Sequence, residues 1–519
     1  MANRNTHFLP ASNSVINNQE VQGLSAFPRE IIIEIFRYCL PELPYRPNPR
    51  MPPILLTHVC PSWRTLASQL PELWQSIRLT MDEGESPFAS ASNPHFQRSP
   101  QIGNPGLKVL EQLGLWERNG DFRPLHLQLD LPWPIGDPDM DDVVVKILTD
   151  SSQRLHRLAF SLYADDANLL DALAATNYPI LEALEVTFQM AGLEWDEITA
   201  TASLTAVNAP RLRRVMLHAV PRLRLDFPWN QLTHLEVKQY HPPSFFRFIM
   251  TNCPNLRRLA LDLHGPFITS GETDSSRNLI VMSSLRKLSL NLRKFEASLF
   301  HQIHFPVLED FRLFNEMGIY MLPWVLPFST YQTHIISQLQ CLRSLILGNQ
   351  TTNTETILGI LRSTPRLVDL TIDSDLGNYT RLFTALAYSQ TVGFDNIIVP
   401  NLEKFSLTIG FAGGVRPLFF ATEPIFHMIT SRNQISSQKE DVVGDASSDR
   451  PSRLADVFLY VADTNETRHI LDSDPRVALF SEGGQGLNFV CQLSADKRAW
   501  REMMATSSWT MRWPSSLPV

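Results

Sequence analysis

The sequence predicts an α/β protein in two parts, a short N-terminal group of three helices followed by a long array of repeated strand-containing units. Apolar side chains recur at helical spacing between residues 24 and 79. A short leucine pattern, L-x-x-L-x-L, then returns many times, with helix-like stretches between its copies. Of the 519 residues, 44% are apolar and 19% are charged, which is enough apolar material for a large core.

Composition argues against several classes of protein. Lys and Arg number 45 against 53 Asp and Glu, so the net charge is −8 and no nucleic-acid binding through bulk positive charge is expected. The five cysteines are far apart and form no C-x-x-C pair, which indicates neither a disulfide framework nor a cysteine zinc site. No signal-peptide-like region opens the chain, and no stretch reaches about 18 uninterrupted apolar residues. We therefore expect no membrane span and a cytoplasmic and/or nuclear location.

The first part of the chain divides by composition into three segments. Residues 1–22 are polar and rich in Asn and Ser, and are expected to be disordered. Residues 23–80 are apolar and helix-like. Residues 81–106 carry turn formers throughout and are expected to form a linker.

Three helices are expected within residues 23–80. The first is capped by Ser25, has Pro28 near its first position, and carries one broad apolar stripe made of Ile31, Ile32, Ile35, Phe36, Cys39 and Leu40. A second is expected over Ile54–Cys60. A third opens at Ser62 and places Trp63, Leu66 and Ala67 on one side. About 50 residues leave little room for a core, so this part should expose apolar surface or dock onto something.

The repeated pattern follows the linker and predicts a strand at each copy. LHLQLDL at Leu125–Leu131 is a plausible opening strand. Eleven units then begin at Leu155, Leu181, Leu212, Leu232, Leu256, Leu285, Leu308, Leu342, Leu367, Leu402 and Leu454. Six of them have a proline two residues before the first leucine, namely Pro179, Pro210, Pro254, Pro306, Pro365 and Pro400. We expect this proline to end the preceding helix and to give an extended approach to the strand.

The spacing of the units favours a leucine-rich-repeat solenoid over residues 107–519. Most first leucines lie 20 to 35 residues apart, close to the period of leucine-rich repeats. Helices are expected between strands at 244–252, 354–363 and 380–389, and the polar segment 433–452 is expected to be a flexible insertion. The asparagine usual in such repeats is mostly missing, so the solenoid should be degenerate and irregular. The alternative is an ordinary α/β protein with parallel strands, whose buried strands also read L-x-L.

One candidate binding site comes from the third position of the repeated pattern, which should face outward on the concave side. Four successive units place Arg214, His234, Arg258 and Lys287 there, and we call these four residues the basic row. Arg213, Arg257 and Arg286 would reinforce its edge. Such a row suits an acidic or phosphorylated segment of a partner, because Arg binds carboxylate and phosphate oxygens bidentately. The alternative is a solvated sheet face with no ligand.

No pattern for catalysis, a cofactor or a metal is found. Phosphate-binding glycine loops, the G-x-S-x-G elbow and H-E-x-x-H do not occur. His301 and His304 have no third ligand nearby, and the acidic run at 137–142 resembles a helix start more than a calcium loop. We therefore expect no catalytic residue, no cofactor and no metal. An enzyme with a site in a repeat loop is the weakest alternative.

The run FPREIIIEIFRYCL, followed after an insert by VCPSWRTLASQLPELW, resembles an F-box. Its usual pattern is L-P-x-E-[LI]-[LI]-x-x-I-F, then V-C-x-x-W-[RK]-x-L-A and a terminal L-W. The residues that match are Phe27, Pro28, Glu30, Ile31, Ile32, Ile35, Phe36, Val59, Cys60, Trp63, Arg64, Leu66, Ala67, Leu73 and Trp74. The match covers about residues 24–79 and is most similar to fungal F-box sequences. It departs from the pattern in the insert at 41–53, in Phe27 and in Pro61.

The resemblance implies a substrate-recognition subunit of an SCF-type cullin–RING ubiquitin ligase. F-box modules bind the small adaptor subunit and, through it, the cullin, while the following domain captures a protein substrate, whose identity is open here. The adaptor contact would fall to Phe27, Pro28, Ile31, Ile32, Ile35, Val59, Cys60, Trp63 and Leu66. Several of these, Trp63 and Ile35 above all, could instead hold the three helices together. The alternative function is a protein-interaction scaffold that uses the same module outside a ligase.

Overall fold

A computed structural model gives the fold of this chain. The residues that it describes are 27–41, 43–80, 105–130, 138–163, 173–189, 201–203, 205, 207–218, 224–263, 279–292, 297–300, 302–315, 338–350, 354–374, 380–388, 397–409, 422–437, 452–462, 469, 471, 473–481 and 487–494.

Three helices open the described chain, as predicted, with shifted boundaries. They are α1 (Arg29–Tyr38), α2 (Ile54–Val59) and α3 (Pro61–Ser68). Pro28 is the N-cap of α1, and Ser25 lies outside the described residues. Helix α2 ends at Val59 because Cys60 is extended, and α3 begins at Pro61, where the missing N–H of proline costs little. The predicted boundaries at Cys60 and Ser62 were therefore each one residue too late.

The chain then enters a 14-stranded sheet in which all neighbouring strands are parallel and follow in sequence order. The strands of this sheet are β1 (Ser76–Thr80), β2 (Leu125–Asp130), β3 (Leu155–Tyr163), β4 (Ala183–Gln189), β6 (Arg214–His218), β8 (His234–His241), β9 (Arg258–Leu263), β11 (Lys287–Leu292), β13 (Asp310–Asn315), β14 (Ser344–Gln350), β15 (Asp369–Ser374), β16 (Lys404–Ile409), β17 (Asp456–Ala462) and β18 (Asn488–Ser494). Two pairs of short strands lie outside it, β5 (Thr201–Ser203) with β7 (Arg224–Asp226) and β10 (Ile280–Val281) with β12 (Ile303–His304).

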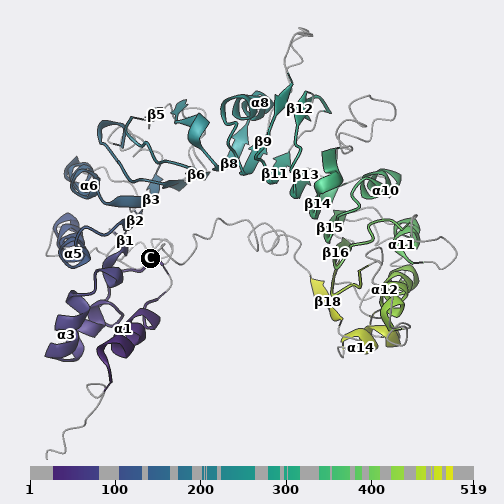
Figure 1. Cartoon of the computed structure of the whole chain (residues 1–519), viewed down its shortest axis with the longest axis horizontal. Coiled ribbons are helices and arrows are strands. Elements are labelled where there is room, and N and C mark those ends of the chain that lie inside the picture. Colours follow the sequence, from purple (N-terminus) through teal and green to yellow (C-terminus); the bar gives the residue numbers. More distant parts are fainter. Residues whose placement is uncertain are drawn as a thin grey trace, which may run out of the picture.

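All eleven leucine units and the opening strand fall in this sheet, so the mixed α/β class predicted from the sequence is confirmed. The first leucine of every unit is buried, as are the second and third apolar positions of most units. Strands β1 and β18 were not predicted. The sheet is open, and Figure 1 shows it bent into an arc whose inner side carries the strands and whose outer side carries the helices.

The outer side is built from helices of varied length. They are α5 (Pro105–Gly120), α6 (Pro138–Ser151), α8 (Pro243–Asn252), α10 (Thr354–Arg362), α11 (Thr380–Leu386), α12 (Thr422–Ser437) and α14 (Pro475–Ser481), with 3₁₀ turns η2 (Pro71–Trp74), η4 (Trp229–Gln231), η5 (Ala297–Phe300) and η7 (Leu339–Cys341). The helices predicted at 244–252, 354–363 and 380–389 correspond to α8, α10 and α11. The acidic run at 137–142 overlaps the first turns of α6, so it lies at a helix start as predicted.

The prolines before the first leucines form turns, which corrects the prediction of an extended approach. The amide of Leu367 donates to the carbonyl of Thr364 at 3.1 Å, and that of Leu212 donates to Ala209 at 3.1 Å. The proline is thus the second residue of a four-residue turn, where its fixed φ is favourable. The turn directs each leucine inward at the start of its strand.

Two predicted boundaries change. Helix α5 begins at Pro105, inside the predicted linker 81–106, and residues 81–104 lie outside the described residues. The predicted flexible insertion 433–452 overlaps the last turn of α12 in residues 433–437, because Arg432 and Asn433 are buried there. Residues 438–451 and the predicted disordered segment 1–22 lie outside the described residues.

The N-terminal helices and the sheet share one core. Trp74 contacts Trp116 of α5 edge to face, with 5.0 Å between ring centroids, and both side chains are fully buried. Trp116 Nε1 donates to the carbonyl of Ser76 at 2.8 Å, and Tyr45 donates to the carbonyl of Leu73 at 2.5 Å. The predicted division between 23–80 and the repeats therefore cuts across a continuous core, with β1 as the first strand of the sheet. Among the described residues, no helix combines the length and apolar character needed to cross a membrane.

Candidate functional site

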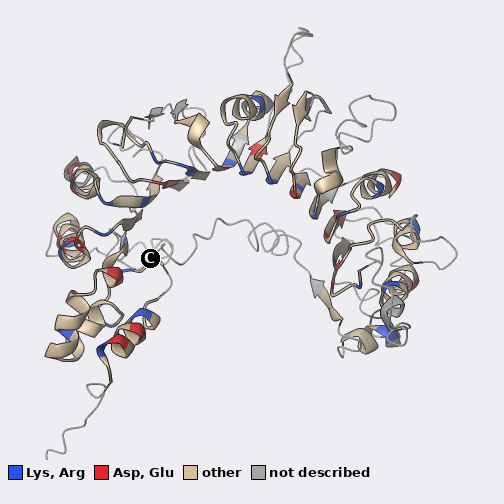
Figure 2. Cartoon of the chain, in the orientation of Figure 1, with Lys and Arg blue, Asp and Glu red and all other residues tan. Residues whose placement is uncertain are grey.

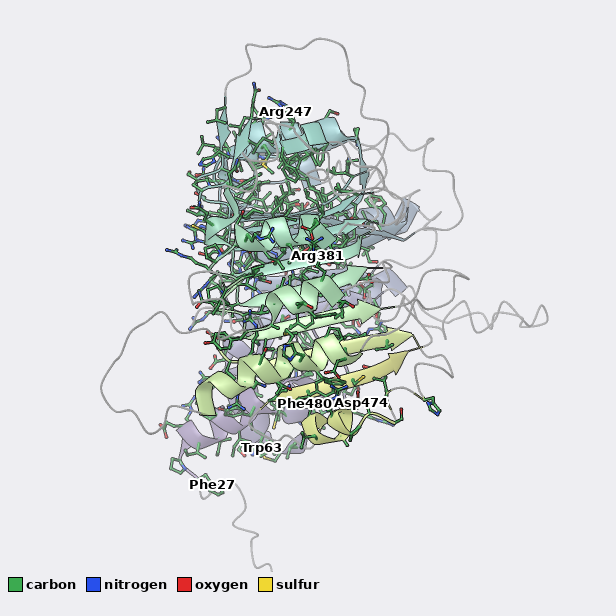
Figure 3. All side chains as sticks on the ribbon, turned by 90° about the vertical axis from the view of Figure 1, so that its right-hand side faces the viewer. Phe27, Trp63, Arg247, Arg381, Asp474 and Phe480 are labelled. Carbon is green, nitrogen blue, oxygen red and sulfur yellow. The ribbon has the colours of Figure 1, made fainter. Side chains whose placement is uncertain are left out.

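Apolar side chains are exposed along the first two helices. Phe27, just before α1, is 51% exposed, and Ile31, on α1, is 46% exposed. Leu55 and Val59 of α2 are 38% and 53% exposed. We call these four residues the N-terminal apolar surface. In Figure 3, Phe27 projects from the end of the molecule that carries Trp63. Exposed apolar side chains that occur in groups mark places where proteins bind one another.

Helix α1 separates its apolar residues into two sides. Phe36 is fully buried and contacts Trp63 of α3 edge to face, with 4.9 Å between centroids. Ile32 also packs against the core. Ile31 and Ile35 are spaced four residues apart, which places them on a common side of the helix, and Phe27 precedes the N-cap Pro28. The predicted single broad stripe is therefore divided into an inner and an outer side.

The nine residues predicted to bind an adaptor are divided in the same way. Phe27, Pro28, Ile31 and Val59 are exposed, whereas Ile35 and Cys60 are half-buried. Ile32, Trp63 and Leu66 are half-buried and pack against the core. Trp63 therefore fits the expectation that some of the nine residues hold the helices together, and Ile32 and Leu66 also fit it.

Cys60 lies at the junction of α2 and α3, within this predicted set. Its Sγ is 3.0 Å from the Ser62 hydroxyl oxygen at the start of α3. The hydrogen bond with Ser62, together with the backbone N–H of Trp63, lowers the pKa of the Cys60 thiol. The junction is thus held by local hydrogen bonds, and Arg64 adds one by donating to the carbonyl of Thr57 at 2.8 Å.

The basic row is assembled by the sheet as predicted. Arg214 pairs with His234, His234 with Arg258, and Arg258 with Lys287 on the neighbouring strands β6, β8, β9 and β11. Paired residues of adjacent strands are about 4.8 Å apart, so the four side chains form one line across the sheet. Arg214, His234 and Arg258 are half-buried, and Lys287 is exposed. Figure 2 shows Lys and Arg along this inner side of the arc.

The charge of the row differs from the prediction at His234. Burial, together with Arg214 and Arg258 beside it, lowers the pKa of His234 to about 4. His234 is therefore neutral near pH 7, and the row has three cations instead of four. Its Nδ1 lies 2.9 Å from the hydroxyl of Thr233.

A buried carboxylate, that of Glu236, lies two residues after His234 on the same strand, β8. Glu236 is 2% exposed, and its carboxylate is 2.8 Å from Lys238 Nζ and 3.6 Å from His218 Nε2. Burial alone would raise its pKa, but His218 and Lys238 more than offset this and hold the pKa below its ordinary value. Burial also lowers the pKa of Arg258, and Glu236 opposes that shift. Part of the positive charge of the row is thus balanced within the sheet.

Beyond Lys287 the charge of the residues along the same line changes sign. The next residues in register are Asp310 of β13, Ser344 of β14 and Asp369 of β15. Asp310 is buried, and its Oδ1 lies 3.2 Å from Arg312 Nε. Burial and the neighbouring Asp310 raise the pKa of Asp369. The line of positions therefore changes from cationic residues to Asp310 and Asp369 after Lys287.

The sequence did not single out a second site, a pocket at the edge of the sheet where strands β11 to β16 begin. Its lining includes Arg286, Arg343, Arg366 and Glu403. These residues come from different units, and only the register of the strands brings them together. Arg286 alone had been noted, as an edge of the basic row.

The described residues contain no group of three or more His, Cys, Asp or Glu side chains placed to hold a metal ion. No family model matches the chain, and no curated protein matches it.

Proposed function

We propose that this chain is the substrate-recognition subunit of an SCF-type cullin–RING ubiquitin ligase, with an F-box that binds the adaptor and a leucine-rich-repeat solenoid that binds a protein substrate. The observation that carries the proposal is the N-terminal apolar surface. Its residues stay exposed although the helices behind them have a complete core around Phe36, Trp63 and Trp74. Exposed apolar side chains that are grouped on neighbouring elements are typical of partner-binding surfaces, which supports the proposal.

The proposed chemistry is proximity. The N-terminal apolar surface lies at one end of the arc, and the inner side of the sheet offers a long charged face for a substrate. A receptor of this kind raises the local concentration of a substrate lysine near the activated ubiquitin and makes no bond itself. The basic row and the acidic positions after it would hold the substrate by complementary charge.

A binding measurement on the full chain tests the adaptor contact. Replacing Ile31 and Val59 by Asp should weaken binding of the purified adaptor by about 30-fold or more, because each change places a carboxylate in an apolar interface. The matched control replaces Leu107 and Leu479 by Asp. Both are 60% exposed and lie on α5 and α14, far along the chain from the first two helices.

Equal binding by both double variants would show that the adaptor does not use this surface, as would absence of binding by the unchanged chain. The melting temperatures of the two double variants should agree, because all four altered side chains are exposed. Co-purification of a cullin with the chain, and accumulation of a bound protein when the chain is depleted, would distinguish the ligase from a scaffold that uses the same adaptor.

A further inference from the structure

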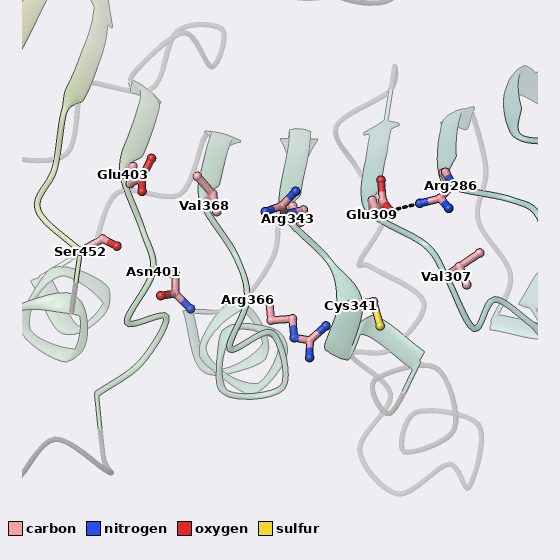
Figure 4. Close-up of a pocket in the computed structure, with 10 residues that line it drawn as sticks. All are labelled: Arg286, Val307, Glu309, Cys341, Arg343, Arg366, Val368, Asn401, Glu403 and Ser452. Carbon is pink, nitrogen blue, oxygen red and sulfur yellow. Dashed lines mark hydrogen bonds and ion pairs between the residues drawn. The ribbon is translucent and has the colours of Figure 1, made fainter. Parts of the chain in front are cut away.

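A pocket of about 630 Å³ lies at the edge of the sheet, along the residues that immediately precede strands β11, β13, β14, β15 and β16. Figure 4 shows its lining as two rows. The upper row contains one residue from each of the five units, Arg286, Glu309, Arg343, Val368 and Glu403, and the lower row contains Val307, Cys341, Arg366, Asn401 and Ser452. We call this pocket the rim groove. Its volume is in the range of ligand pockets.

The backbone fixes the upper row. The amide of Glu309 donates to the carbonyl of Arg286, Arg343 to Glu309, and Val368 to Arg343, each at 2.8 Å. Glu403 continues the ladder by donating to Val368 at 2.9 Å. The side chains are therefore spaced by the strand separation of about 4.8 Å, on a support that the whole sheet holds in place.

The charges along the groove are only partly matched. Arg286 forms an ion pair with Glu309 at one end. Within the described part of the chain, Arg343 and Arg366 form no ion pair or side-chain hydrogen bond, and neither does Glu403. Arg343 and Arg366 belong to adjacent units and line the same pocket. Among the described residues, these two guanidinium groups and this carboxylate thus have no side-chain partner, and they line the same pocket.

We propose that the rim groove binds a short protein segment in which an acidic residue precedes or follows a basic residue by three positions. The carboxylate or phosphate of the acidic residue binds Arg343 and Arg366, since guanidinium groups fork such oxygens bidentately. The basic residue binds Glu403. The residues between them cross Val368, which offers an apolar contact between Arg343 and Glu403 in the upper row.

The spacing of three positions follows from the sheet. Arg343 precedes β14 and Glu403 precedes β16, so they are two strand separations apart, about 10 Å. A polyproline II segment rises about 3.1 Å per residue and returns to the same side every three residues, which spans about 9 Å. A fully extended segment alternates sides and would place residues three positions apart on opposite faces. The groove therefore fits a polyproline II segment.

This assignment rests on the proposed function only in taking the ligand to be part of a protein substrate. The rim groove is separate from the N-terminal apolar surface, and each can be tested on the same purified full-length chain.

Fluorescence anisotropy with labelled hexapeptides tests the ligand. The probe is Gly-Glu-Pro-Pro-Lys-Gly, whose prolines favour polyproline II. Replacing its Glu by Gln, or its Lys by Gln, should weaken binding at least fivefold each. A phosphoserine in place of Glu distinguishes the source of the negative charge, and tighter binding of that peptide than of the Glu peptide assigns the site to phosphorylated segments. Equal binding of the probe and of both Gln peptides would overturn the proposal.

Variants of the chain locate the binding. Replacing Arg343 and Arg366 by Glu should abolish binding of the probe. The matched control replaces Arg211 and Arg213 by Glu, which are exposed arginines at the same two positions of another unit. Loss of binding in the control but not at Arg343 and Arg366 would place the ligand at the basic row and refute the rim groove.

A charge swap separates recognition from damage to the fold. Glu403→Lys should weaken binding of the probe and strengthen binding of Gly-Glu-Pro-Pro-Glu-Gly. A misfolded chain would not bind the second peptide more tightly. Adaptor binding is measured on every variant in parallel. Retained adaptor binding with no peptide binding by the unchanged chain would refute the rim groove alone. Peptide binding with no adaptor binding would refute the proposed function alone.

Discussion

His126 shows how a single buried residue can make the stability of this sheet depend on pH. It lies on β2 in register between Ser76 and Arg157, and it is 3% exposed. Its Nδ1 is 3.5 Å from the Ser76 hydroxyl. Burial, reinforced by the positive charges of Arg157 and His156, lowers its pKa to about 3. His126 is therefore neutral wherever the chain is folded at ordinary pH.

We predict that acidification destabilises the chain through His126. Its folded pKa is about 3, and an unfolded histidine has a pKa of about 6.5, so below pH 6.5 the unfolded chain takes up a proton that the folded chain refuses. The resulting loss is absent above pH 7 and reaches on the order of 2 kcal/mol at pH 5. Urea unfolding of His126→Asn at pH 7 and pH 5 should show a smaller loss than the unchanged chain.

The exposed His58 provides the control for this measurement. His58→Asn should leave the difference between the two pH values as it is in the unchanged chain. If His126→Asn also leaves it unchanged, the proton uptake does not occur at His126. His234 and His241, whose pKa values burial also lowers to about 4, would then have to account for any acid sensitivity.

At the scale of the element, the strands could be predicted because each unit repeats one physical requirement. Leucines on one side of every strand have to be buried against the neighbouring units, and the pattern L-x-x-L-x-L records that. The chain around β1 reads LWQSIRL and that around β18 reads LNFVCQL. In register with the buried apolar residues of the neighbouring strands, β1 has Ile77 and Leu79 and β18 has Phe489 and Cys491, so neither repeats the full leucine pattern. Those strands were missed because their own residues carry too little of the pattern.

The candidate sites could likewise be predicted only in part. The alignment of the basic row was predictable, since equivalent positions of parallel strands lie side by side. The charge of His234 was not, because it depends on how deeply the sheet buries that imidazole. The rim groove was not predictable from any one unit, since its charges lie at two different positions in five units.

The turn before each strand leads to a prediction about Ser283. The amide of Leu285 donates to the carbonyl of Met282 at 3.3 Å, which repeats the turn that contains proline in six other units. Ser283 is exposed and occupies the position of that proline. Ser283→Pro should stabilise the chain by about 0.4–1 kcal/mol, because it restricts the unfolded chain without strain in the folded one.

Urea unfolding measures this gain, and Ser284→Pro is the matched control. Proline is disfavoured at the third residue of such a turn, so that variant should be less stable than the unchanged chain. Destabilisation by Ser283→Pro would mean that this unit does not form the turn of the other six.

At the scale of the whole molecule, the order of the strands determines how stability is distributed. Every strand of the 14-stranded sheet pairs only with the strands before and after it in sequence. No strand from one end of the chain pairs with a strand from the other, and the arc in Figure 1 keeps the first and last described strands apart. Damage at one place can therefore open its neighbours while distant strands keep their hydrogen bonds.

Leu370→Ala tests this distribution. Leu370 of β15 is fully buried and in register with Leu345 and Phe405, so the variant should lose about 2–5 kcal/mol locally. Hydrogen exchange should rise in β14 to β16 and stay unchanged in β1 to β3. Leu127→Ala in β2, also fully buried, should give the opposite distribution. If both variants raise exchange equally along the whole sheet, the chain unfolds as a single cooperative unit, and opening the far end of the arc would also unfold the N-terminal apolar surface.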